Sequence, residues 1–236
     1  TKLSERLSQT VIVENKAGGN QTIGVELVAR APADGYTLIM GTMGSHAVNA
    51  SLRKDMRVNL NDDFAAVLMV PSQPLILVVN PRVPANSLAQ LLELMKANPG
   101  KYTFGSAGVG TSAHMAAELF QIKAGLTLVH VPYKGSGPML NDLLGGQIDM
   151  AFDYAPTALP HVKSGRLRAL AATSAKRVDF APELPAVNEF VPGFRVMAWQ
   201  GVFAPAKTPQ PVLDRLSTEI QAIMKQPDVV ARIHEM

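Results

Sequence analysis

The stretch 102–115 reads Tyr102-Thr103-Phe104-Gly105-Ser106-Ala107-Gly108-Val109-Gly110-Thr111-Ser112-Ala113-His114-Met115. Its aromatic and β-branched start favours a strand, and its glycines permit backbone shapes that other residues resist. Thr111 or Ser112 is a suitable N-cap for the helix that the following residues predict. A helix start behind small residues presents unpaired N–H groups and the positive end of the helix dipole. The stretch therefore predicts a strand, a loop and a helix start that together bind an anion, with an ordinary tight turn as the alternative.

Nucleotide sites are the familiar form of such a loop, and the sequence disfavours them. The order Gly108–Ala113 satisfies the loose dinucleotide pattern, which also requires an acidic residue about 20 positions later. The next predicted strand, 126–133, ends without a carboxylate before Asp142. A P-loop needs a lysine after its last glycine, and Gly110 is followed by Thr111.

The composition indicates a globular chain and excludes several classes of protein. Of 236 residues, 47% are hydrophobic and 17% charged, with a net charge of +3 and no cysteine. Basic residues are scattered, so no nucleic-acid partner is expected, and no apolar run approaches the ~20 residues of a membrane span. No signal peptide is visible, and Leu3 and Leu7 have helical spacing, as though the chain were entered within a helix.

The remaining pattern alternates strands with helices, which predicts an α/β fold. A strand is expected at 11–15, followed by a turn at 17–20. The predicted strand 36–40 leads into a second small-residue loop, Gly41–His46, and 64–70 and 75–80 are expected as two strands separated by prolines. Asp153 ends the predicted strand 148–153. Ligands of open α/β sheets bind at the carboxyl ends of strands, where both loops and Asp153 are placed.

Several segments resemble one known family over nearly the whole chain, in the same order. They are 13–20 (Val-Glu-Asn-Lys-Ala-Gly-Gly-Asn), 32–38 (Pro-Ala-Asp-Gly-Tyr-Thr-Leu), 105–114, 131–135 (Val-Pro-Tyr-Lys-Gly), 159–170, and the tail from 201–205 through Thr208-Pro209 to 226–228. The chain resembles the solute-binding receptors of tripartite tricarboxylate transporters, the Bug or TctC family.

The resemblance implies a type II periplasmic-binding-protein fold with two α/β lobes joined by a crossing-strand hinge. The lobes are expected at 1–79 with 201–236, and at 80–200. It also implies a periplasmic receptor, without cofactor or metal, that captures a small carboxylate for the membrane subunits of a transporter. A monomer is the default expectation. The residues expected to hold the ligand are Gly41, Thr42, Ser45, Ser106, Ala107, Gly108, Gly110, Thr111, His114 and Asp153. Asp153 is expected at the ligand's far end, accepting from an amine or a hydroxyl group.

One departure and several alternatives accompany this interpretation. The family has a strand and a glycine-proline loop before the helix entered at residue 1, and this sequence does not contain them. An enzyme is not expected, because no Gly-x-Ser-x-Gly elbow or other catalytic constellation is present. His114 and Glu118 have the spacing of two metal ligands on one helix face, but a structural pair is favoured. An effector-sensing domain of a regulator and, less favoured, a nucleotide-binding enzyme domain remain the alternatives, and the sequence does not identify the ligand.

Overall fold

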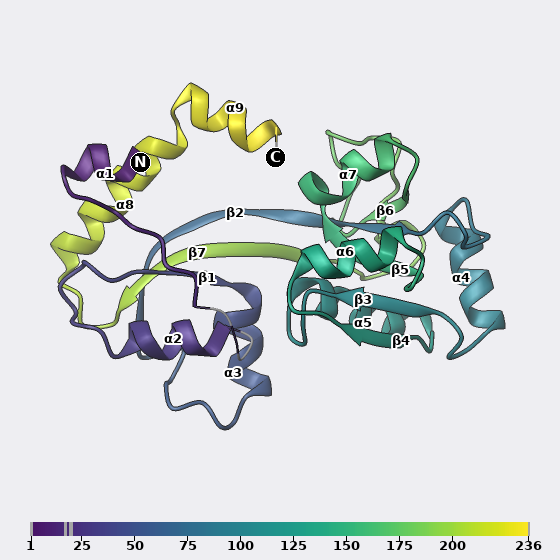
Figure 1. Cartoon of the computed structure of the whole chain (residues 1–236), viewed down its shortest axis with the longest axis horizontal. Helices are drawn as coiled ribbons and strands as arrows, with labels where there is room; N and C mark the ends of the chain where they lie inside the picture. The colour runs from purple at the N-terminus through teal and green to yellow at the C-terminus, as the bar shows by residue number, and fades with distance from the viewer. Residues whose placement is uncertain (1, 17, 19–20, 236) are drawn as a thin grey trace. The chain divides into compact units, whose positions relative to one another are not determined.

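A computed structural model describes residues 2–16, 18 and 21–235 (Figure 1). The chain divides into two compact units. Unit 1 contains residues 1–71 and 199–236, and unit 2 is the continuous segment 72–198. Both divisions fall inside strands, because β2 (Phe64–Val79) and β7 (Met197–Pro205) each begin in one unit and end in the other.

Unit 1 combines a small antiparallel sheet with helices from both ends of the chain. β1 pairs with β7, with Gly41 opposite Gly201, and β7 also neighbours β2. The core of unit 1 is formed by Val67, Val202, Ala204, Leu213 and Leu216. The other elements of unit 1 are α1 (Lys2–Leu7), α2 (Thr22–Ala29), β1 (Ile39–Thr42), the π-helix η2 (Gly44–Val48), α3 (Asn49–Leu52), α8 (Gln210–Met224) and α9 (Pro227–Glu235).

Unit 2 is built on a mixed sheet in the order β6-β2-β5-β3-β4. β3 lies parallel to both β4 and β5, whereas β2 runs antiparallel to β5 and β6. The elements of unit 2 besides β2 are α4 (Leu88–Ala97), β3 (Thr103–Ser106), α5 (Ser112–Ala124), β4 (Val129–Pro132), α6 (Ser136–Leu144), β5 (Met150–Tyr154), α7 (Ala155–Lys163), β6 (Arg168–Ala172) and the 3-10 turn η3 (Val187–Glu189).

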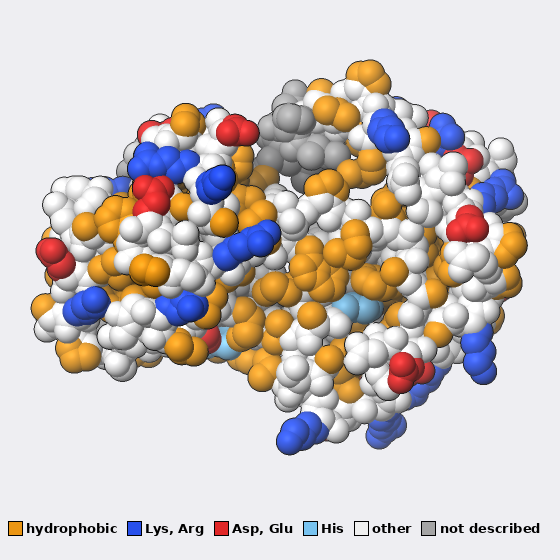
Figure 2. All heavy atoms as spheres, turned by 180° about the vertical axis from the view of Figure 1, so that it is seen from behind, with side chains coloured by type: hydrophobic (Ala, Val, Ile, Leu, Met, Phe, Trp, Pro, Cys, Tyr) orange, Lys and Arg blue, Asp and Glu red, His pale blue; other side chains and the backbone are white. Residues whose placement is uncertain are grey.

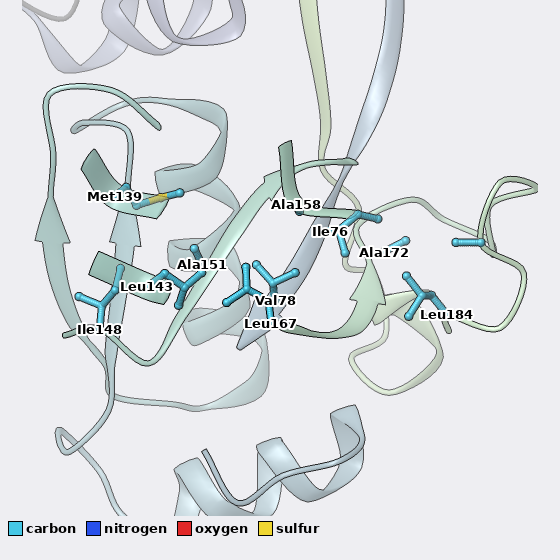
Figure 3. Close-up of a cluster of buried hydrophobic side chains, with 11 residues drawn as sticks. Ile76, Val78, Met139, Leu143, Ile148, Ala151, Ala158, Leu167, Ala172 and Leu184 are labelled. Carbon is cyan, nitrogen blue, oxygen red and sulfur yellow. The ribbon is translucent and has the colours of Figure 1, made fainter. Parts of the chain in front are cut away.

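The core of unit 2 explains why its strands read as unbroken apolar runs. Leu75–Val79 of β2 are all fully buried, as in a strand covered on both faces. Figure 3 shows side chains of β2 and β5 meeting those of α6, including Val78, Ala151 and Leu143. The sheet is thereby fixed against its helices, and the carboxyl ends of β3 and β5 are held side by side.

The predicted α/β class is confirmed, and two local predictions are wrong. Residues 11–15 form no strand, and Ile12 and Val13 are 72% and 85% exposed, because no neighbouring strand among the described residues offers them a ladder. β2 is one strand of 16 residues rather than two, and its prolines lie in an exposed stretch of it. The turn expected at 17–20 lies, apart from Gly18, outside the described residues.

The charged surface follows the expectation from composition. On the face drawn in Figure 2, lysines and arginines are dispersed among acidic and neutral side chains and form no continuous basic patch. Among the described residues, no helix has the length and apolar character needed to cross a bilayer.

Candidate functional site

The loop between β3 and α5 in unit 2 is stabilised largely by its own hydrogen bonds. The Gly108 amide donates to Ser106 Oγ at 3.2 Å, and the Thr111 amide donates to the Gly108 carbonyl at 3.3 Å. The Thr111 hydroxyl also donates to that carbonyl, at 2.8 Å, while it caps α5 by accepting from the His114 amide. Gly108 has a φ of +137°, which an L-residue rarely adopts, so this loop shape requires glycine there.

Some backbone N–H groups of this loop and helix start remain without a partner. In the part of the chain that the structure describes, no acceptor atom pairs with the amides of Ala107, Val109, Ser112 or Ala113. Ser112 and Ala113 are only 5% and 8% exposed, and unpaired amides at buried positions are costly. They therefore need an acceptor such as water or a bound anion. Fewer amides are thus available to an anion than the sequence indicated, because the amides of Gly108, Gly110 and Thr111 already donate hydrogen bonds within the loop and helix start.

Two stacked histidines lie behind the loop. His114 stacks on His130 with ring centroids 4.3 Å apart, and Gly110 donates its amide to His114 Nδ1 at 3.1 Å. His130 Nε2 lies 2.7 Å from Ser106 Oγ. Burial lowers the pKa of His114, and burial followed by the neighbouring His114 lowers the pKa of His130 to about 4. Both rings are therefore neutral near neutral pH.

The end of β5 lies beside this loop, since Gly105 of β3 pairs with Ala151 of β5. Asp153 is 2% exposed and accepts from the Thr157 hydroxyl at 2.7 Å. Burial raises the pKa of Asp153 above its ordinary value. Burial raises the pKa of the Tyr154 phenol, and the Ser112 side chain opposes this shift. Sequence reasoning placed Asp153 but did not connect Tyr154 with Ser112.

In unit 1, the loop after β1 folds back on itself. Thr42 donates its amide to Ser45 Oγ at 2.9 Å, and the Ser45 amide approaches Thr42 Oγ1 at 3.2 Å. Ser45 is fully buried, and its hydroxyl also lies 2.9 Å from His46 Nδ1. His46 stacks on Phe203, and its Nε2 is buried without a partner among the described residues. Burial lowers the pKa of His46 to about 4.

The predicted site residues thus fall into two groups. Ser106, Ala107, Gly108, Gly110, Thr111 and His114 are brought together in one loop and helix start of unit 2, with Asp153 on the neighbouring strand. Thr42 and Ser45 form a compact turn of unit 1, and Gly41 precedes this turn in β1. A ligand role for any of them stays a prediction. His114 Nε2 lies 3.5 Å from Glu118, and no group of three or more possible metal-binding side chains occurs in the described ranges.

Comparison with known proteins places the chain in one family. A model of the tripartite tricarboxylate transporter family receptor, TctC, matches residues 1–236. A UPF0065 protein from the tcbD-tcbE intergenic region of Pseudomonas sp. strain P51 is 39% identical over 100% of this chain and 70% of its own length. The protein BugT of Bordetella pertussis is 37% identical over 97% of this chain and 71% of its own length.

Solved structures agree with this assignment. Rhodopseudomonas palustris Rpa4515 with adipate has a TM-score of 0.93 at 34% identity, covering 99% of this chain and 79% of its own. The periplasmic binding protein BugD has a TM-score of 0.90 at 34% identity, covering 99% and 78%. The R. palustris protein MatC with bound malate has a TM-score of 0.91 at 28% identity, covering 99% and 80%. The resemblance inferred from the sequence is confirmed: the chain belongs to the tripartite tricarboxylate transporter receptor family, whose members are periplasmic solute-binding proteins and not enzymes.

Proposed function

We propose that this protein is a periplasmic receptor that binds a small carboxylate and delivers it to the membrane subunits of a tripartite tricarboxylate-type transporter. The proposal rests on the unpaired amides of Ser112 and Ala113 at the start of α5, beside those of Ala107 and Val109. A carboxylate accepts hydrogen bonds from several such amides, and the helix dipole adds to its attraction.

The chemistry of the loop supports a carboxylate rather than a more highly charged anion. No lysine or arginine occurs between Lys101 and Lys123, so binding would depend on neutral donors. Two similar proteins of known structure were solved with dicarboxylates, adipate for Rpa4515 and malate for MatC. We therefore take adipate and malate as the first probes for this protein.

The other predicted residues have roles within this proposal. Gly108 and Gly110 set the loop shape, and Thr111 caps the helix whose first amides bind the ligand. Gly41, Thr42 and Ser45 are the proposed contribution of unit 1. Asp153 is proposed to accept from a ligand hydroxyl or amine, which favours malate over adipate.

A thermal-shift series with adipate, malate and other di- and tricarboxylates tests the proposal, with ATP and NAD as controls. A ligand at a hundred times its Kd adds about 2.7 kcal/mol to the free energy of unfolding. For a chain of this size that raises Tm by roughly 5–11 °C. A shift produced by a nucleotide alone would contradict the proposed carboxylate site.

A matched pair of variants tests the amide itself. Ser112→Pro removes the N–H from the first helical position, where proline is tolerated, and the preceding Thr111 already has the extended ψ of 161° that proline favours. Ser112→Ala removes only the hydroxyl and keeps the amide. Loss of one hydrogen bond to a charged ligand costs about 1.5–3 kcal/mol, so Ser112→Pro should weaken binding by about 10- to 100-fold relative to Ser112→Ala. Equal affinities of the two variants would show that this amide does not bind the ligand.

Delivery requires a separate experiment, because binding alone does not identify a transporter. Vesicles that contain the membrane subunits of a tripartite tricarboxylate transporter should accumulate labelled ligand when this receptor is added. Uptake that is the same with and without the receptor would argue against delivery.

A further inference from the structure

His130 contacts the loop between β3 and α5 through Ser106, and the sequence did not predict this contact. It lies on β4, and its ring stacks with Phe104 of β3, at a centroid distance of 4.6 Å, and with His114 of α5, at 4.3 Å. Its Nε2 lies 2.7 Å from the hydroxyl of Ser106, a residue with no exposed surface. Two ring contacts and one polar contact therefore hold the ring in place.

The Ser106 hydroxyl links His130 to Gly108 of the loop. Its oxygen accepts from the Gly108 amide at 3.2 Å and lies 3.1 Å from the Gly108 carbonyl. A hydroxyl has one proton, so it donates either to the Gly108 carbonyl or to His130 Nε2. In the first arrangement His130 donates to the oxygen, and in the second it accepts from it. Either tautomer of the neutral ring preserves the contact between Ser106 and the Gly108 amide.

His114, which stacks with His130, contacts Gly110. His114 Nδ1 accepts from the Gly110 amide, which is possible only while Nδ1 carries no proton. The stacked pair thus reaches both ends of the segment 108–110: His130 acts through Ser106 on Gly108, and His114 acts directly on Gly110. The amides of Ala107 and Val109, which alternate with these glycines, remain unpaired among the described residues.

We infer that His130 is a positioning residue: through Ser106 and through its stack on His114, it holds the loop in the shape that leaves the Ala107 and Val109 amides available to a carboxylate. This inference rests on the proposed function, because only a binding loop needs that shape. The role of His130 is to keep the amides of Gly108 and Gly110 paired within the protein, so that the amides of Ala107 and Val109 stay unpaired.

Substitutions at His130 separate positioning from general stability. His130→Leu removes the nitrogen at the Ser106 hydroxyl, whereas the longer amide of His130→Gln reaches the position of Nε2 and His130→Asn does not. His161→Leu is the matched control, since this histidine of the same unit lies on α7 and contacts Arg166. Two readouts are measured: hydrogen exchange of the Gly108 amide without ligand, and the Kd for adipate and for malate.

We expect His130→Leu to accelerate Gly108 exchange and to weaken binding by about tenfold, the effect of losing roughly one hydrogen bond of loop support. His130→Gln should restore both properties, and His161→Leu should leave Gly108 exchange unchanged. Unchanged Gly108 exchange and unchanged affinity in His130→Leu would overturn the inference. If that variant fails to fold, the comparison of Gln with Asn decides, and equal values for the two would overturn it.

The two proposals fail in different ways. If the wild-type protein binds neither adipate nor malate, the proposed function fails for these acids, while Gly108 exchange still tests the positioning role. If the wild type binds and His130→Leu binds equally well with an unchanged loop, only the positioning role is rejected.

Discussion

Replacing Gly41 with alanine should destabilise unit 1, because two aromatic rings occupy the space of the added methyl group. A Cβ at this position would lie 2.5 Å from His46 Nδ1 and 2.7 Å from Phe203 Cε2. Comfortable carbon contacts are about 3.5–4.0 Å, so the rings would have to move by about 1 Å. His46 has little room to do so, since it also packs edge-on against Phe64 at 4.9 Å.

The expected cost follows from overpacking in a filled core. Such insertions typically cost about 1–3 kcal/mol. At about 2–4 °C per kcal/mol for a chain of this size, Tm should fall by roughly 2–12 °C. Calorimetry together with urea unfolding measures both quantities on the same protein.

Gly137→Ala provides a matched control with the opposite sign. Gly137 lies in α6, and no atom lies within 4 Å of an added Cβ. Alanine is favoured over glycine in helices by up to about 1 kcal/mol, so this variant should be unchanged or slightly more stable. A Gly41→Ala protein as stable as Gly137→Ala would refute the argument that the His46 and Phe203 rings require glycine at position 41.

Three further outcomes are expected. Burial raises the pKa of Asp153, so the folded chain keeps this proton to a higher pH than the unfolded chain, and stability falls as pH rises through that pKa. Asp153→Asn, which still accepts from Thr157, should be more stable at neutral pH and lack this fall in urea titrations across pH; an unchanged pH dependence would contradict the cause given. Burial lowers the pKa of His46 to about 4 from 6.5, so stability should fall as pH drops from 6.5 to 4, and His46→Leu should flatten this slope. The same slope in both proteins would count against it. Thr111→Val removes the cap of α5 and should cost about 1 kcal/mol in calorimetry, whereas Thr111→Ser should retain it; equal losses would show that the hydroxyl does not matter.

Elements decided by local chemistry were predictable from the sequence. Thr111 caps α5, as its position before the predicted helix indicated. Elements that depend on distant partners were not. The apolar residues Val11–Val13 have strand propensity but no ladder among the described residues, and β2 continues through Pro71, which lies in an exposed stretch of the strand.

In the candidate site, too, local features were predictable and features that depend on distant partners were not. The glycine pattern predicted the position of the loop, but not which of its amides are unpaired. That depends on Ser106 and His114, whose side chains take the amides of Gly108 and Gly110. Gly105 was expected to be needed for its backbone conformation. A Cβ there would lie 2.4 Å from Ile148 Cδ1, so glycine is needed at this position for close packing. The contact of His130 with Ser106 was not predicted, because the two residues lie 24 positions apart in the sequence.

The division of the chain into a continuous unit 2 and a discontinuous unit 1 has a consequence for synthesis on the ribosome. Unit 2 has all its residues once Ala198 is made, whereas unit 1 still lacks most of β7 and all of α8. The ion pair of Arg6 with Glu219 joins residues 213 positions apart, and contacts of such separation form late and slowly. At that stage β1 still lacks its partner strand β7, and α1 still lacks its partner helix α8. The nascent protein therefore passes through a stage in which all of unit 2 has been made and unit 1 still lacks its last strand.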